Sequence, residues 1–307
     1  MLNKDKDFIE ERLLSRVPEY NTKFPSTILI DTISFCNLRC SMCFHHSMKR
    51  KKGIMEMDLF KKIIDEVAVK RPNAKIWITF FGEGLMLKDL PQKVKYAKDC
   101  GLTDVLLNSN GNLLKNEFSK QLIISGLDAI YVGIDAFKKD TYEKFRVGGN
   151  LEKVVKGVLE YKELLSKYGN SKQKIFVQFV EMEENKKELD DFVSFWNGHE
   201  VPVKIRPMVS WGGKVEANYV ADGIDRIPCF WAMNTINISD NGKVCLCSVD
   251  LDCEENMGDI NTQSIEEVWN STLLEFRRNH IERLWDNLPN MCQNCKDWIS
   301  GYAEYKG

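Results

Sequence analysis

The sequence predicts a parallel α/β protein, either a doubly wound sheet or a barrel that is complete or partial. From residue 27 onward, short β-branched runs alternate with longer amphipathic segments, which is the pattern of repeated β-α units. A glycine, a common helix stop, follows three of the amphipathic segments. The chain has 307 residues, 43% of them hydrophobic, which suffices for a sizeable core in one large domain or in a medium domain with a small appendage.

The expected elements follow in order along the chain. The strands are predicted at 27–33, 75–80, 104–108, 129–134, 174–180 and 203–207. The helices are predicted at 58–69, 91–100, 117–125, 151–167 and 188–196. In the first helix Leu59, Ile63 and Val67 share one face, and Asp58 can cap its start.

Composition divides the chain into four parts. Residues 1–25 are charged, with a weak helical pattern, and are expected to form a surface lead-in. The α/β pattern occupies 26–210 and gives way to a bridge rich in glycine at 211–228, where we expect a domain boundary. Residues 229–307 contain six of the ten cysteines and form the expected C-terminal domain.

Charge and hydropathy limit the classes of partner. The net charge is −2, so no overall field attracts nucleic acid or an anionic membrane. No apolar run approaches the roughly 20 residues that cross a bilayer, and the N-terminus lacks the apolar region of a secretory signal. We therefore expect a cytoplasmic protein that binds neither nucleic acid nor membrane. Its cysteines are then expected to be metal ligands or reactive thiols rather than disulfides.

Cys36, Cys40 and Cys43 come directly after the first predicted strand. Active sites of parallel α/β folds lie at the carboxyl ends of strands, where three thiolates can converge on one centre. Three ligands suit a four-iron cluster with one iron left open for a small molecule. A zinc site completed by His45 or His46, or three unrelated thiols, are the alternatives.

The segment CNLRCSMC at 36–43 resembles the cluster-binding motif of the radical S-adenosylmethionine (radical SAM) superfamily. The resemblance implies a partial (β/α)6, TIM-like barrel over 26–210, in which the three cysteines hold a [4Fe–4S] cluster and S-adenosyl-L-methionine chelates the open iron. One electron then cleaves S-adenosylmethionine to a 5′-deoxyadenosyl radical. The family usually has an aromatic residue before the third cysteine, to pack on adenine. Here that residue is Met42, whose polarizable thioether can take the same place.

Shorter motifs similar to those of the family follow the next strands. FGEG at 81–84 resembles its Gly-Gly-Glu-Pro motif, although Phe81 replaces the first glycine and Gly84 the proline. NSNG at 108–111 is similar to Thr-Asn-Gly, and GIDA at 133–136 to Ser-Ile-Asp-Gly. Each motif alone is also an ordinary turn. Together they imply a cofactor site formed by Met42, Gly82, Glu83, Asn108, Ser109, Asn110, Asp135, Arg146 and Gln178. In relatives the glutamate contacts the methionine amino group and an arginine holds the carboxylate.

The C-terminal cysteines resemble the auxiliary-cluster module called the SPASM or twitch domain. The pattern places Cys229 before a Gly-x4-Cys run ending at Cys247, and Cys292 before Cys295. The resemblance implies that these four hold an auxiliary [4Fe–4S] cluster. Cys245 is the rival for Cys247, and a structural zinc knuckle is the alternative for the whole group. The helix predicted at 265–280 is expected to be structural.

Several further residues are candidates for a role at the site. Cys245 and Cys253 are possible hydrogen donors to a substrate radical. The basic run at 49–52 is either a solvated loop or a dock for an acidic electron donor. Asp31, Glu181, Arg206, Trp211 and Asp250 are candidates for substrate contact by position alone.

The resemblance implies an enzyme that abstracts hydrogen from a polar small molecule of the sugar or aminocyclitol type, giving oxidation or epimerisation. A maturase acting on a ribosomally made peptide and a non-catalytic iron–sulfur electron carrier are the alternatives. The expected partners are the substrate and a reductant such as flavodoxin or ferredoxin.

Overall fold

The computed structural model describes residues 6–15, 22–217 and 224–307, and a ten-stranded sheet forms its centre. Six strands come from the predicted runs: β1 (Thr27–Ile30), β2 (Lys75–Trp77), β3 (Asp104–Ser109), β4 (Ala129–Gly133), β5 (Lys174–Glu181) and β6 (Val203–Pro207). The C-terminal part adds β7 (Thr235–Ile238), β8 (Lys243–Cys245), β9 (Gly258–Asp259) and β10 (Glu304–Lys306).

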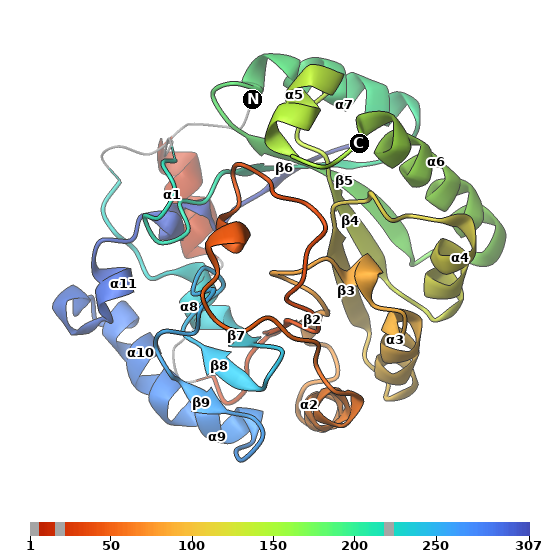
Figure 1. Cartoon of the computed structure of the whole chain (residues 1–307). Helices are drawn as coiled ribbons and strands as arrows, with labels where there is room; N and C mark the ends of the chain where they lie inside the picture. Colours follow the sequence, from red (N-terminus) through yellow and green to blue (C-terminus); the bar gives the residue numbers. More distant parts are fainter. Residues whose placement is uncertain (1–5, 16–21, 218–223) are drawn as a thin grey trace.

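Strands β1 to β6 lie side by side in chain order, and every neighbouring pair is parallel. The sheet curves around the loop that follows β1 and carries its helices on the outside (Figure 1). This architecture is the predicted partial (β/α)6 barrel. It brings the carboxyl ends of the six strands to one rim, where the loops that bear the sequence motifs begin.

The outer layer consists of helices whose apolar faces pack on the sheet. They are α1 (Lys6–Leu14), α2 (Met57–Lys70), α3 (Leu90–Asp99), α4 (Asn116–Ile124), α5 (Lys139–Phe145), α6 (Leu151–Tyr168) and α7 (Leu189–Gly198), followed by α8 (Phe230–Asn234), α9 (Ile265–Asn270), α10 (Thr272–Ile281) and α11 (Asn290–Gln293). In α6 the Asn150 side chain accepts a hydrogen bond from Lys153 N at 2.8 Å and so caps the first turn, while Val158 is buried. Gly101 and Gly126 end α3 and α4 with φ of 90° and 92°, the left-handed conformation that glycine adopts freely.

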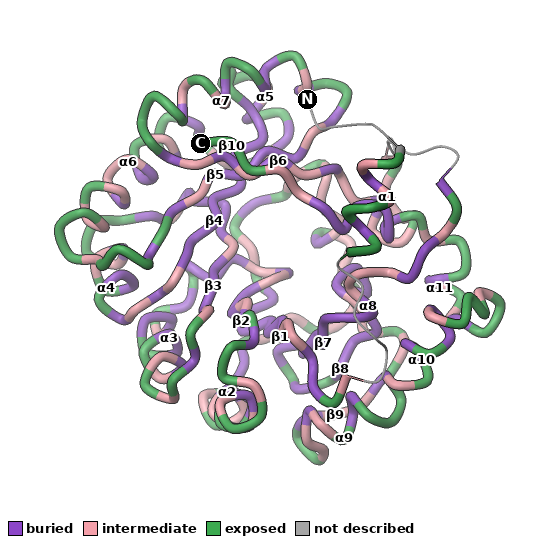
Figure 2. The backbone as a smooth tube through the Cα atoms, turned by 180° about the vertical axis from the view of Figure 1, so that it is seen from behind, coloured by how far each residue is buried: buried purple, intermediate pink, exposed green. Residues whose placement is uncertain are grey.

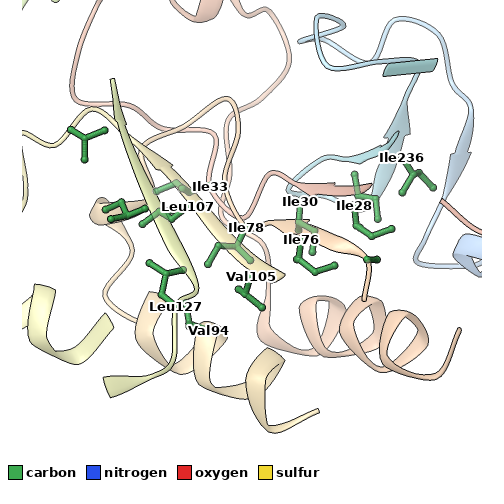
Figure 3. Close-up of a cluster of buried hydrophobic side chains, with 14 of the residues drawn as sticks. Ile28, Ile30, Ile33, Ile76, Ile78, Val94, Val105, Leu107, Leu127 and Ile236 are labelled. Atoms are coloured by element: carbon green, nitrogen blue, oxygen red, sulfur yellow. The ribbon is translucent and has the colours of Figure 1, made fainter. Parts of the chain in front are cut away.

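Strand side chains alternate between an outer and an inner core. Ile28, Ile30, Ile76 and Ile78 belong to the large cluster shared with the helices (Figure 3). A separate inner cluster contains Tyr131, whose ring stacks on Phe176 with centroids 4.7 Å apart. Tyr131 pairs with Phe176 across β4 and β5, and Gly133 pairs with Gln178 two residues later. The aromatic layer therefore lies inside the barrel, directly below the polar residues at the rim.

The C-terminal part continues the same sheet. Strand β7 pairs in parallel with β1, β8 and β9 follow in antiparallel pairing, and β10 returns to pair with β6. Buried residues run along β7 and β8 as they do along the barrel strands, whereas β9 and β10 contain none, and exposed residues lie on the outer helix surfaces (Figure 2). Residues 218–223 of the predicted bridge lie outside the described residues.

Three local predictions are wrong. The N-terminal part is not a surface lead-in throughout, because Ile9 and Leu13 of α1 are 0% and 1% exposed within the main core. The segment 265–280 forms two helices that meet at Ser271, whose φ and ψ are not helical. Asp58 does not cap α2, since Glu56 occupies the cap position without a side-chain cap bond.

In the described part of the chain, no helix is both long and apolar enough to cross a membrane.

Candidate functional site

The loop after β1 carries Cys36, Cys40 and Cys43 and is held by backbone hydrogen bonds on two sides. On the α5 side these bonds join Arg39 N to Val147 O (3.0 Å) and Ser41 N to Phe145 O (2.9 Å). On the β2 side, Glu83 N donates to Phe35 O at 2.8 Å. Gly82 is needed there because a Cβ would collide with the Ile33 carbonyl oxygen. The cysteine loop is therefore fixed against the carboxyl ends of the strands.

The three cysteines of this loop are unpaired thiols, and two of them have polar neighbours. Asn110 Nδ2 lies 3.9 Å from Cys36 Sγ, and Arg146 Nη1 lies 3.8 Å from Cys40 Sγ. Burial raises the pKa of Cys36, and it raises that of Cys43 to about 11. Thiols in such surroundings keep their protons until a metal displaces them.

The donor set of the loop fits an iron–sulfur cluster. Three thiols lie in one loop, and an amide and a guanidinium stand near two of the sulfurs, as second-shell donors to thiolates do. His45, a possible fourth ligand in the zinc alternative, instead places Nε2 2.8 Å from Ser34 O. Within residues 6–15, 22–217 and 224–307, no group of three or more Cys, His, Asp or Glu side chains is already arranged to hold a metal ion. Cluster binding therefore requires the cysteine side chains to draw together.

Glu83 is fully enclosed by its own protein neighbours. Its carboxylate accepts hydrogen bonds from Leu85 N (3.0 Å), Ser109 Oγ (2.8 Å) and Asn110 N (2.7 Å). Burial raises its pKa against the effect of these donors. Glu83 thereby ties the end of β2 to the loop after β3, and it places Ser109 and Asn110 beside the cysteine loop.

Asp135 and Arg146 form a buried ion pair at the end of β4. Asp135 has a φ of 64° and accepts from Arg146 Nε at 2.9 Å, while its other oxygen accepts from Val180 N at 2.8 Å. The guanidinium lies over Gly133, where a Cβ would collide with it. Arg146 is therefore already paired with Asp135, and its Nη1 lies beside Cys40 of the cysteine loop.

The remaining predicted cofactor residues lie on the inner face of the rim. Gln178 Nε2 donates to Asn108 Oδ1 at 3.1 Å. Met42 packs in a small cluster with Phe145, Val180, Met182 and Met208, and its carbonyl accepts from Trp211 Nε1 at 2.9 Å. An exposed edge of this apolar cluster would suit an adenine ring, as the thioether at 42 predicts.

The second cysteine group lies in the C-terminal part of the chain. Cys229 precedes α8, Cys247 follows β8, Cys292 lies in α11 and Cys295 follows it. Burial raises the pKa of all four thiols, and together the effects on Cys295 bring its pKa to about 12. The neighbouring thiols raise the pKa values of Cys247, Cys292 and Cys295 further, so the four lie close enough to influence one another electrostatically. Asp297 N donates to Cys295 Sγ at 3.3 Å. Four free thiols in one neighbourhood fit a fully cysteine-ligated cluster.

Cys245 and Cys253 form a disulfide in this structure, which the sequence analysis did not expect. Neither sulfur carries a hydrogen atom in this state, so the role of hydrogen donor would require reduction of the pair. The bond also removes Cys245 as the rival ligand and leaves Cys247 as the free thiol of the Gly-x4-Cys run.

The basic run at 49–52 is not a solvated loop throughout. Arg50 is buried between two carboxylates, donating to Asp31 at 2.7 Å and forming an ion pair with Asp240. It also donates to Leu251 O at 2.7 Å. Burial raises the pKa of Asp31 to about 7, against the lowering effect of Arg50. Sequence reasoning missed this link between the cysteine loop and the C-terminal part, because no local pattern pairs residues so far apart.

Two segments of the chain, each with one of the two cysteine groups, match models of known protein families. Residues 30–193 match the radical SAM superfamily, and residues 229–296 match the SPASM iron–sulfur cluster-binding domain. The first match covers more than half of the chain, so the chain belongs to the radical SAM superfamily and is an enzyme of that class. Membership brings a [4Fe–4S] cluster and S-adenosylmethionine to the barrel, and the SPASM domain brings auxiliary iron–sulfur binding.

Solved structures share this fold at low sequence identity. BtrN, in complex with S-adenosylmethionine and 2-DOIA, has a TM-score of 0.60 at 19% identity, covering 88% of this chain and 92% of its own. Streptococcus suis SuiB bound to its precursor peptide SuiA has a TM-score of 0.69 at 12% identity, covering 88% and 69%. The structure of anSMEcpe with S-adenosylmethionine and a peptide gives 0.61 at 14% identity, covering 89% and 87%.

Relatives with higher sequence identity match shorter segments. The probable GTP 3′,8-cyclase of Methanococcus maripaludis strain C5 is 35% identical over 124 residues, 40% of this chain and 41% of that protein. The tungsten-containing aldehyde ferredoxin oxidoreductase cofactor-modifying protein of Pyrococcus furiosus is 31% identical over 173 residues, 55% and 47% of the two chains. The chain thus spans less than half the length of these relatives.

Proposed function

We propose that this enzyme cleaves S-adenosylmethionine reductively and abstracts a hydrogen atom from a polar small molecule of the sugar or aminocyclitol type, giving oxidation or epimerisation. When bound, the barrel cluster supplies one electron and S-adenosylmethionine supplies the 5′-deoxyadenosyl radical that removes the hydrogen. The observation that carries the proposal is the loop of three free thiols at the carboxyl rim, with the Asn110 amide and the Arg146 guanidinium beside the sulfurs.

The barrel residues have distinct proposed roles. Cys36, Cys40 and Cys43 hold the first cluster. Met42, Gly82, Glu83, Asn108, Ser109, Asn110, Asp135, Arg146 and Gln178 form the S-adenosylmethionine site. In that site Glu83 and the Asp135–Arg146 pair act chiefly by positioning, since their hydrogen bonds already fix the rim. Gln178 and Asn108 turn amide groups toward the inside of the barrel and can accept a ribose or substrate hydroxyl.

The C-terminal domain, proposed at 229–307 after a bridge at 211–228, would accept the electron left on the substrate. Cys229, Cys247, Cys292 and Cys295 are its proposed cluster ligands. This electron route favours oxidation to a carbonyl. Epimerisation would instead need hydrogen from Cys245 or Cys253, which are joined to each other in this structure.

A peptide substrate is the second candidate, supported by the likeness of the fold to SuiB bound to a precursor peptide. The family assignment removes the non-catalytic electron carrier. We propose a cytoplasmic enzyme reduced by flavodoxin or ferredoxin.

The test is anaerobic reconstitution followed by dithionite and S-adenosylmethionine, with liquid chromatography of the products. Slow formation of 5′-deoxyadenosine without substrate is expected, and its absence from a fully reconstituted sample would reject the proposal.

A further inference from the structure

Two polar side chains on the inner face of the barrel, the partly buried Arg206 and the buried Asn237, have buried atoms without hydrogen-bond partners among the described residues. On β6, Val203 and Ile205 pack toward the helices, so the alternation of a strand turns Arg206 inward. On β7, the flanking isoleucines turn Asn237 inward in the same way. The Nε of Arg206 and both amide atoms of Asn237 are buried and unpaired.

The guanidinium of Arg206 carries a charge that the protein does not neutralise. It lies within electrostatic reach of Cys43, Asp135 and Arg146, but the Asp135 carboxylate is already bonded to Arg146 and to a backbone amide. No described residue forms an ion pair with Arg206. A buried charge left in this state destabilises a fold, and it is retained where a ligand supplies the missing counter-charge.

Asn237 lies on β7, across the curved sheet from β6 (Figure 1). The sheet order places β6 and β7 near its two ends, and the curvature brings these ends to face each other (Figure 1). Asn237 is 3% exposed and lies beside Asp31, Phe81 and Cys245, which line a shallow depression with it. An amide both donates and accepts, so it suits a neutral hydroxyl or amide group of a ligand.

We infer that the substrate carries a carboxylate or phosphate group that binds Arg206, and a neutral polar group that binds Asn237. This inference rests on the proposed function and narrows it. A plain aminocyclitol has no anion and would leave Arg206 unpaired, whereas a sugar acid, a sugar phosphate or an acidic peptide end would pair with it. Arg206 is a substrate-binding residue in this scheme, separate from Arg146, which stays with Asp135 and the cysteine loop.

The first test uses simple anions on the anaerobically reconstituted holoenzyme. Thermal unfolding is followed while inorganic phosphate or succinate is titrated at constant ionic strength, for the wild type, Arg206→Met and the control Arg278→Met, whose arginine is exposed. At least one anion should raise the midpoint of the wild type and the control but not of Arg206→Met. The anion that acts distinguishes a phosphate from a carboxylate. Equal shifts in all three proteins, or none in the wild type, would overturn the inference.

The second test separates binding from structure. Without anions, Arg206→Met should unfold about 2–4 °C above the wild type, because it removes an unpaired buried charge, and Asn237→Leu should also rise. A midpoint below that of the wild type in either variant would make that side chain structural.

The dissociation constant for S-adenosylmethionine, measured by equilibrium dialysis, should change less than threefold in Arg206→Met. A tenfold weakening would mean that Arg206 holds the cofactor carboxylate, which overturns the inference. A lack of 5′-deoxyadenosine from the wild type would reject the proposed function and leave these binding results intact.

Discussion

Glu83 illustrates how a motif residue can act through its neighbours. The family motif implies contact with the methionine amino group, yet here the carboxylate is held by Leu85, Ser109 and Asn110. Removing it would release the loop after β3 and leave two backbone amides without an acceptor.

We expect Glu83→Ala to weaken S-adenosylmethionine binding at least tenfold, about 1.4 kcal/mol, without loss of iron. Equilibrium dialysis and iron analysis on the reconstituted protein measure both quantities. Exposed Glu143→Ala is the matched control and should bind normally. Loss of iron in Glu83→Ala would instead mean that this residue supports the cysteine loop.

Asp31 should give the enzyme a pH-dependent stability. Its pKa rises from 3.8 in the unfolded chain to about 7 in the fold, chiefly because of burial. Between these values the folded state binds more protons than the unfolded state, so the stabilising effect of protonated Asp31 is present below pH 4 and is lost as the pH rises through 7. The limit of this effect is about 4 kcal/mol.

The thermal midpoint should therefore fall between pH 5 and pH 8, and Asp31→Asn should lose much of this dependence. Asp140→Asn, at an exposed position, serves as the control and should behave as the wild type does. If Asp31→Asn kept the full pH dependence, Asp31 would be ionised in the fold throughout this range and paired with Arg50.

At the scale of elements, α1 is the segment whose role the sequence predicted least well. Its charged composition predicts a surface helix, but Ile9 and Leu13 are buried against the core. We expect Leu13→Ala to lower the free energy of unfolding by about 2–5 kcal/mol, as for other buried leucines. The neighbouring Leu14 is 44% exposed, so Leu14→Ala should change it by less than about 0.5 kcal/mol. Urea denaturation measures both, and equal small effects would show that α1 is only loosely attached.

Local periodicity predicted the barrel elements well because it reports which face of each segment is buried. The run at 174–180 became β5, and the segment at 151–167 became α6, each within one residue of the predicted ends. Periodicity does not report hydrogen bonds between distant segments. It therefore missed the break at Ser271 and the contact of Arg50 with Asp31 and Asp240.

The same distinction applies to the site. Cysteine spacing within a loop is a local pattern, so it predicts which thiols could share a cluster after β1 and near the chain end. The partners of Asp135 and the unpaired amide of Asn237 depend on strand pairing, which no single segment encodes. The Cys245–Cys253 bond was missed because spacing alone gave neither residue a specific partner.

For the whole molecule, the two cysteine groups should load independently. The reconstituted wild type is expected to hold about eight irons per chain in two four-iron clusters. A double Cys292→Ser, Cys295→Ser variant should fall to about four irons and still cleave S-adenosylmethionine slowly, because the loop after β1 remains intact. Cys100→Ser, at the end of α3, should keep about eight. Four irons and one zinc in the wild type would replace the auxiliary cluster by a zinc site.

The continuous sheet also joins the two centres mechanically. Strand β7 pairs with β1, so the C-terminal part is fixed beside the strand that leads into the first cysteine loop. The C-terminal domain is thereby held at the barrel, as the proposed transfer of an electron from the substrate radical to the auxiliary cluster would require.

Turnover in D2O distinguishes the two outcomes. In an oxidation, hydrogen abstraction is followed by loss of one proton and one electron, which leaves a carbonyl and places no solvent deuterium at the reacting carbon. In an epimerisation, a thiol that exchanges with solvent returns a hydrogen atom, so one deuterium remains at the inverted carbon. While the Cys245–Cys253 bond is intact neither sulfur has hydrogen to give, and the proposed auxiliary cluster offers the electron acceptor that an oxidation needs, so oxidation is the expected result. Sugar acids and sugar phosphates are the substrates to test first, and mass spectrometry of the product gives the measurement.

Cys245→Ser and Cys253→Ser should both retain turnover. Deuterium at an sp3 carbon of the product, lost in either serine variant, would establish a thiol donor and make the enzyme an epimerase.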